Sequence, residues 1–302
     1  MSQSKSNIKG ILFALISSGT FGLVPLFSLP LMVPSLRPEG ILAISVPTIL
    51  FYRFLFSSIT MGAVCSFKKM SLKINLKDIG MIFLLALLYA ATAKFLVDSY
   101  EYIASGLATT IHFLYPIFVS FIMISFFKEK KSTILLIAAL LSLLGVGFMC
   151  WHGETSKGLA TGLILSAITV FTYGLYIIGL NKSRVSQIPV ETLTFYVLFF
   201  GCIIFFVYAL LTTGIEPINL TSDWVNLILL GFFATFISDL TLVLAIKYAG
   251  STITSILGSM EPVVAVLIGS FFFAEHFDMY SALGLLLVLS SVTLVILFNN
   301  NK

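Results

Sequence analysis

A gapless internal match constrains this chain more than any other feature of its sequence. The segment from Tyr102 to Glu129 lies over the segment from Tyr248 to Glu275, and every paired position is 146 residues apart. The identical pairs include Pro116 with Pro262. Both copies lie in long apolar stretches, and a repeat of this kind in a very apolar chain is typical of membrane proteins built from two related halves.

The composition places most of the chain in lipid. Hydrophobic residues make up 59% of the sequence and charged residues 10%, with a mean hydropathy of +1.09. A helix needs about 20 apolar residues to cross a bilayer, and the chain contains runs of that length one after another. Ten expected spans cover 11–33, 42–66, 79–98, 103–127, 132–151, 158–180, 192–212, 224–246, 248–273 and 279–298. The sequence therefore predicts an all-α membrane protein with ten transmembrane helices and the lipid bilayer as its surroundings.

The basic residues predict the orientation of these spans. With the N-terminus in the cytoplasm, thirteen of the 17 lysines and arginines lie at cytoplasmic ends, against Arg37 and Lys157 outside. This bias follows the positive-inside rule and places both termini in the cytoplasm. Two sets of five helices then enter the membrane in opposite senses, which predicts inverted five-helix repeats at 1–151 and 152–302. The net charge of +4 reflects these anchors, so no nucleic-acid partner is predicted.

The first helices of the two halves repeat more weakly. Four positions of the first expected span match four of the sixth at an offset of 152: Gly10, Thr20, Gly22 and Leu23 with Gly162, Thr172, Gly174 and Leu175. Small residues of this kind let membrane helices approach closely. We therefore expect the shared glycines to mark equivalent packing contacts.

The repeated segments also carry a family resemblance. Leu114-Tyr115-Pro116-Ile117-Phe118 runs to Glu129, and Met260-Glu261-Pro262-Val263-Val264-Ala265 runs to Glu275. With Arg53 in the second expected helix, these strings resemble the drug/metabolite transporter superfamily, specifically its EamA type. Where that family commonly has glycine before the terminal glutamate, this chain has Lys128 and Ala274. The resemblance implies a secondary transporter of a bacterial inner membrane and covers exporters of amino acids, drugs and other metabolites. We interpret Glu129 and Glu275 as structural.

Ionisable side chains inside a membrane are costly, which makes each one a candidate for function. Arg53, His112, Tyr115 and Glu261 each lie about 13–18 Å from their helix ends at 1.5 Å per residue, near the bilayer midplane. Transporters place their binding sites at that depth. The sequence therefore predicts these four residues as the substrate-binding site for a small organic molecule.

Two of these residues have opposite charges. Glu261 either has a transport role, in which it binds a substrate ammonium group or carries the coupling proton, or is a static partner that neutralises Arg53. Arg53 is in turn either a clamp for a carboxylate or phosphate, or a structural counter-ion. A cation and an anion at similar depth favour a zwitterion such as an amino acid.

Three further charged residues are candidates for gating or proton coupling, with Glu261. Lys94 and Asp98 lie toward the outer face, one helical turn apart, where the pair also has the simpler interpretation of satisfying itself. Asp239 lies toward the cytoplasm, so we do not expect it to pair with Lys94. His112 either relays a proton or bonds a neighbouring backbone group.

Three prolines predict breaks in the membrane helices. Pro25, Pro116 and Pro262 each lack the N–H that an uninterrupted helix requires. Each break is either a point of flexure during transport or a static bend. Four aromatic residues, Phe21, Phe95, Tyr173 and Tyr196, are candidates for lining a substrate path, although Phe is abundant in this chain and usually faces lipid or packing.

Several classes of function compete with the preferred prediction of an amino-acid exporter that works by alternating access. The main alternative is a multidrug or organic-cation exporter of the same superfamily, for which Glu261 would dominate. A channel and a membrane-embedded enzyme are less favoured, and no catalytic motif, metal site or cofactor is predicted. Both a monomer and a homodimer are left open.

Overall fold

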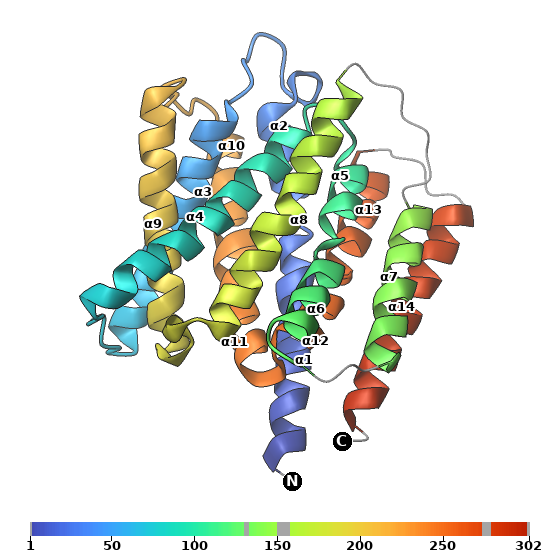
Figure 1. Cartoon of the computed structure of the whole chain (residues 1–302). Helices are drawn as coiled ribbons and strands as arrows, with labels where there is room; N and C mark the ends of the chain where they lie inside the picture. Colours follow the sequence, from blue (N-terminus) through green and yellow to red (C-terminus); the bar gives the residue numbers. More distant parts are fainter. Residues whose placement is uncertain (1, 130–132, 150–157, 274–278, 301–302) are drawn as a thin grey trace.

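The chain forms a single bundle of helices. The computed structural model describes residues 2–129, 133–149, 158–273 and 279–300, and within these ranges it contains helices and turns but no β-strand. The helices stand side by side, and the start of α1 and the end of α14 lie at the same end of the bundle (Figure 1). The structure confirms the expected all-α class for the described residues.

The bounds of the helices follow the expected spans closely. Up to residue 149 they are α1 (Ser2–Phe21), α2 (Val24–Met32), η1 (Pro34–Leu36), α3 (Val46–Phe67), α4 (Leu76–Ser99), α5 (Ser105–His112), α6 (Tyr115–Ser125) and α7 (Thr133–Met149). From residue 159 they are α8 (Leu159–Lys182), η2 (Arg184–Gln187), α9 (Val190–Leu211), α10 (Thr221–Gly231), η3 (Phe232–Ile237), α11 (Ser238–Ala249), α12 (Ser251–Leu257), α13 (Met260–Phe272) and α14 (Met279–Asn300). The expected boundary at 151/152 lies outside the described residues.

Seven stretches of the described chain are long and apolar enough to cross a membrane. They are 8–32, 46–67, 76–99, 159–182, 190–211, 221–249 and 251–272. Three further apolar helical stretches are shorter: Tyr115–Ser125, Leu136–Gly145 and Ala282–Ser291. They fall in the remaining expected spans. The count of ten transmembrane helices is thus not confirmed by length and composition, and it stays a prediction.

Three of the spans are interrupted near the prolines singled out from the sequence. Pro25 lies in the first turn of α2, Pro116 in the first turn of α6 and Pro262 in the first turn of α13. At each junction some backbone N–H groups bond the carbonyl three residues earlier instead of four. An example is the 2.9 Å bond from the Glu261 N–H to the Gly258 carbonyl. A proline removes one donor and its ring crowds the preceding turn. The predicted breaks are therefore present, and their flexure stays a prediction.

A fourth span is interrupted without a proline. Between α10 and α11 the segment η3 is π-helical, so its carbonyls bond one residue further along the chain than in an α-helix. Such bulges are frequent at functional sites because they free backbone groups for other partners. The sequence carries no proline here, although Gly231 directly precedes the segment, and this feature was not predicted.

The glycines at the offset of 152 make equivalent contacts. A Cβ atom on Gly10 would lie 2.6 Å from Cβ of Ala249, and one on Gly162 would lie 2.8 Å from Cγ2 of Ile103. Ala249 and Ile103 are themselves 146 residues apart. The same holds one step deeper, where Gly22 meets Val264 and Gly174 meets Phe118. These close approaches support the interpretation of the chain as two related halves.

The helix pairs are arranged around the broken helices. α1 packs along α11, α3 along α9 and α4 along α8, while α7 and α14 pack mainly on each other. In Figure 1 the pair α7 and α14 stands at one side of the bundle. Between the other pairs, α5 contacts α13 and α6 contacts α12, which brings the two broken helices together. The breaks meet in the interior of the bundle.

Candidate functional site

The four predicted midplane residues are all buried. Arg53 on α3, His112 at the end of α5, Tyr115 at the start of α6 and Glu261 in α13 expose at most 2% of their surface. The structure divides them into two centres. His112, Tyr115 and Glu261 form one group, which we call the acid centre, and Arg53 lies in a second group with other partners.

The acid centre is built where the two broken helices meet. The Tyr115 hydroxyl donates to Oε1 of Glu261 at 3.3 Å, and Nε2 of His112 lies 3.7 Å from Oε2 of Glu261. The other ring nitrogen, Nδ1, is 2.8 Å from the Thr169 hydroxyl on α8. Oε2 of Glu261 and Nε2 of His112 are buried and have no hydrogen-bond partner. Two polar atoms that face each other in this way are suited to share a proton or to bind a polar group between them.

Aromatic rings form the walls of the acid centre. The rings of Tyr115 and Tyr173 meet edge to face with centroids 4.7 Å apart, and His112 lies 5.0 Å from Tyr173. The Phe21 ring lies 6.1 Å from both His112 and Tyr173. Of the four predicted aromatic candidates, Phe21 and Tyr173 are thus at the site, whereas Phe95 lies against Lys94 and Tyr196 donates its hydroxyl to the Leu72 carbonyl. Ring faces attract cations, so this lining favours a ligand that brings a positive charge to Glu261.

Arg53 is held by the π-helical segment. Its Nε donates to the Thr235 hydroxyl at 2.5 Å and its Nη2 to the Ala234 carbonyl at 3.3 Å. The guanidinium also lies over the rings of Phe21, at 5.8 Å, and Phe54, at 6.0 Å. Within the described ranges no carboxylate oxygen lies within 4.0 Å of Arg53. A direct ion pair between Arg53 and Glu261, one of the two interpretations of Glu261, is therefore not what the structure shows.

Asp239 joins the surroundings of Arg53. It follows Thr235 by one helical turn, is 1% exposed, and accepts a 2.6 Å hydrogen bond from the Tyr176 hydroxyl. Its second oxygen, Oδ2, is buried without a hydrogen-bond partner. The Tyr176 ring stacks on that of Tyr89 at 4.9 Å, and Tyr89 interacts electrostatically with Arg53. The sequence predicted that Asp239 lies toward the cytoplasm; in the structure it is buried and interacts electrostatically with Arg53.

Sequence reasoning missed Tyr89, Tyr176 and Thr235. One signal was available, because Tyr89 and Thr235 are 146 residues apart and hold equivalent positions in the repeat. The chain has 11 tyrosines, so the presence of a tyrosine in an expected span did not distinguish Tyr89 and Tyr176 from the others.

Lys94 and Asp98 lie apart from the two centres. They form an ion pair one turn apart on α4, with side chains 27% and 19% exposed. The Lys94 ammonium group also lies over the rings of Phe95 and Tyr208, at 5.4 Å and 5.2 Å. Lys94 thus pairs with its neighbour rather than with Asp239, while the predicted role of the pair in gating or coupling stays a prediction. Glu129 accepts a 2.9 Å hydrogen bond from Thr252, and Glu275 lies outside the described residues.

Comparison with known proteins gives a consistent result over nearly the whole chain. The family model described as the EamA-like transporter family matches residues 8–151 and again residues 160–297. An uncharacterized transporter of Archaeoglobus fulgidus is 25% identical over 226 residues, which cover 74% of this chain and 80% of that protein. The uncharacterized transporter YxxF of Bacillus subtilis is 23% identical over 217 residues, covering 69% of this chain and 67% of that protein.

A solved crystal structure shares the fold. It superposes with a TM-score of 0.78 over 96% of this chain and 98% of the other chain, at 12% sequence identity. At that identity the likeness concerns the arrangement of the helices alone. The chain thus combines a known helical architecture with two buried charge centres, the acid centre where its broken helices meet and the surroundings of Arg53 at the π-helical segment.

Proposed function

This chain belongs to the EamA-like transporter family, and from that premise we propose that it exports amino acids or related zwitterions by alternating access. In this proposal the acid centre binds the ammonium group of the substrate, and Arg53 attracts its carboxylate group across the Phe21 ring. The two repeats, 1–151 and 152–302, rock against each other around these centres. The membrane is a bacterial inner membrane with both termini in the cytoplasm.

The observation that carries the proposal is the incomplete bonding of Glu261. Its Oε2 is buried, faces Nε2 of His112 at 3.7 Å and has no hydrogen-bond partner. A carboxylate of purely structural use would normally be satisfied, because an unpaired buried acid is costly. Burial of the acid centre also means that a substrate reaches it only after the helices move, as alternating access requires.

An organic-cation exporter is the second candidate. The rings of Phe21, Tyr115 and Tyr173 near Glu261 favour a cationic ligand with or without a carboxylate. Arg53 is meanwhile engaged by Thr235 and Ala234, so its guanidinium is partly occupied. The two candidates differ in whether transport needs Arg53, and loss of transport in Arg53→Met favours the zwitterion.

The test is countertransport in proteoliposomes. Vesicles are preloaded with an amino-acid mixture, and exchange of each labelled amino acid is followed for the unchanged protein and for Glu261→Gln. Glu39→Gln is the matched control, because it makes the same chemical change at an exposed residue. We expect saturable exchange that Glu261→Gln loses and Glu39→Gln keeps.

Two outcomes would contradict the proposal. Exchange of organic cations but of no amino acid would support the acid centre as the binding site and contradict amino acids as the substrates. Flux that does not saturate with concentration would contradict a carrier altogether and point to a channel. A pH gradient imposed across the same vesicles tests proton coupling, since a coupled exporter accumulates substrate against its gradient only when the proton gradient is present.

A further inference from the structure

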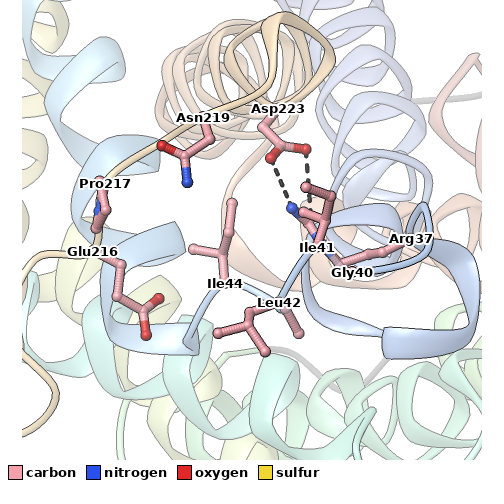
Figure 2. Close-up of a pocket in the computed structure, with 10 residues that line it drawn as sticks. Arg37, Gly40, Ile41, Leu42, Ile44, Glu216, Pro217, Asn219 and Asp223 are labelled. Atoms are coloured by element: carbon pink, nitrogen blue, oxygen red, sulfur yellow. Dashed lines mark hydrogen bonds and ion pairs between the residues drawn. The ribbon is translucent and has the colours of Figure 1, made fainter.

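A buried ion pair closes the outer end of the bundle, the end away from the termini. Arg37, which follows η1, places Nη2 at 2.8 Å from Oδ2 of Asp223 and Nη1 at 3.3 Å from Oδ1. The two side chains are only 2% and 6% exposed. The same Nη1 donates to the carbonyls of Pro30 and Leu31 on α2, at 3.2 Å and 3.1 Å. Asp223 lies in the first turn of α10, so the pair ties α2 to α10 (Figure 2).

Further bonds join the same two connections. The Ser45 N–H donates to Oε2 of Glu216 at 2.6 Å, and the Thr48 hydroxyl donates to the Gly214 carbonyl at 3.4 Å. Between these bonds and the ion pair lies a pocket of about 290 Å³, lined by Arg37, Glu216 and Asp223 among others. In Figure 2 Glu216 stands on the far side of this pocket from the ion pair. The pocket is thus bounded by contacts between residues 30–48 and 213–223.

A second arginine–aspartate pair lies at the inner end, the end with the termini. Nε of Arg184 in η2 is 2.6 Å from Oδ1 of Asp78 in the first turn of α4. Their side chains are 53% and 17% exposed. Nearby, the Tyr196 hydroxyl donates to the Leu72 carbonyl at 2.7 Å. These contacts tie the start of α4 and the connection before it to η2 and α9.

The two pairs occupy equivalent places in the repeat. Arg37 follows the first expected span and Arg184 the sixth, while Asp78 and Asp223 directly precede the third and the eighth. The arginines are 147 residues apart and the aspartates 145, next to the repeat offset of 146. Each pair also joins one half of the chain to the other. A rocking motion of the halves that opens one end would separate the pair at that end and leave the other pair formed.

We propose that Arg37–Asp223 and Arg184–Asp78 are the two gates of the transporter, which open in alternation at opposite ends of the bundle. This inference rests on the proposed alternating access and adds the residues that hold each end closed. Both pairs are formed in the structure, and the acid centre between them is buried, which corresponds to a state closed at both ends. The outer pair is the more buried and has two hydrogen bonds, so it is the stronger gate.

The test measures access to the centre and needs no substrate. In a background with the three native cysteines replaced by serine, Thr169→Cys places a thiol beside His112 in the buried centre. A membrane-impermeant thiol reagent is then added to one side of oriented vesicles. We expect Asp223→Asn to increase labelling from the outside by about tenfold or more, because about 1.4 kcal/mol shifts such an equilibrium tenfold. Asp78→Asn increases labelling from the inside by a smaller factor.

Matched controls separate gating from a general loss of structure. Glu39→Gln at the outer end and Lys77→Gln at the inner end change an exposed charge next to each gate and leave labelling unchanged. The exchanged pair Arg37→Asp with Asp223→Arg restores low labelling if the attraction between the two side chains closes the gate. Equal labelling from both sides after Asp223→Asn, or no change in labelling, overturns the proposal.

The two proposals fail separately. If the gates are wrong but the transporter is right, amino-acid exchange is retained and labelling from each side is insensitive to Asp223→Asn and Asp78→Asn. If the substrate class is wrong but the gates are right, labelling responds as expected and no amino acid exchanges.

Discussion

The two broken helices, α5 with α6 and α12 with α13, share their backbone geometry and differ in chemistry. Both break just before a proline, and each packs against the other at its break. Yet Tyr115 in the first occupies the position of Glu261 in the second, and His112 occupies that of Gly258. The repeat thus supplies the same break twice, while only one copy carries the acid. The site is complete only when the tyrosine and the imidazole of one half meet the carboxylate of the other.

The largest effect is expected at the acid itself. Glu261→Gln should lower substrate exchange by about 10- to 100-fold, because a hydrogen bond to a charged group contributes about 1.5–3 kcal/mol. Its equivalent, Tyr115→Phe, removes one 3.3 Å hydrogen bond and keeps the ring, so exchange should fall less than about tenfold. Initial exchange rates in proteoliposomes measure both.

Stability gives an independent reading of the same substitution. Oε2 of Glu261 has no hydrogen-bond partner, so Glu261→Gln should leave the unfolding free energy within about 1 kcal/mol of the unchanged protein. The midpoint of thermal unfolding in detergent checks this. A large loss of stability would show that Glu261 holds the helices together. The difference between Tyr115 and Glu261 would then reflect helix packing and not substrate binding.

The next effect is expected at Gly258, which faces the tyrosine of the other half. A Cβ atom there would lie 1.7 Å from the Tyr115 hydroxyl oxygen and 2.8 Å from the Ser255 carbonyl oxygen. Gly258→Ala should therefore push Tyr115 away from Glu261 and cost about 1–3 kcal/mol of stability through overpacking. Thermal unfolding and exchange rates are the measurements.

Gly19→Ala is the control for this substitution, because no atom lies within 4 Å of the Cβ that it adds. If Gly258→Ala is as stable and as active as Gly19→Ala, the two breaks do not meet as closely as the structure describes.

The breaks themselves could be predicted from the sequence, because proline acts through its own covalent structure wherever it stands in a helix. The burial of Glu261, His112 and Arg53 was likewise predictable from the length of the apolar runs around them. The Lys94–Asp98 pair followed from their spacing of four residues, which places both side chains on one face of a helix.

The partners of Arg53 could not be predicted. Thr235 and Ala234 contact Arg53 because they lie in a π-helical segment. Neither a proline nor a change in the apolar pattern marks this segment in the sequence. The pair Arg37–Asp223 was also missed, since its members lie 186 residues apart in connections whose course only the folded chain determines. Sequence spacing predicts contacts within one helix, whereas contacts between connections depend on the three-dimensional arrangement.

The smallest effect separates two equivalent glycines, Gly22 and Gly174. A Cβ atom on Gly22 would lie 2.7 Å from the backbone carbonyl oxygen of Glu261, which has little freedom to move. A Cβ atom on Gly174 would instead lie 2.5 Å from Cδ1 of the half-buried Phe118 ring, a side-chain atom that shifts more readily than a backbone carbonyl. Gly174 also lies within α8, where alanine gains about 1 kcal/mol over glycine.

Gly22→Ala should therefore cost about 1–3 kcal/mol, and Gly174→Ala should be close to neutral. Thermal unfolding of the two single variants and of the double variant measures the difference. Because Gly22 touches the backbone of the acid-bearing helix, Gly22→Ala should also lower exchange while Gly174→Ala leaves it nearly unchanged. Equal losses of stability in Gly22→Ala and Gly174→Ala would mean that the two halves are alike in rigidity as well as in shape. The asymmetry of the site would then be confined to the side chains of Tyr115 and Glu261.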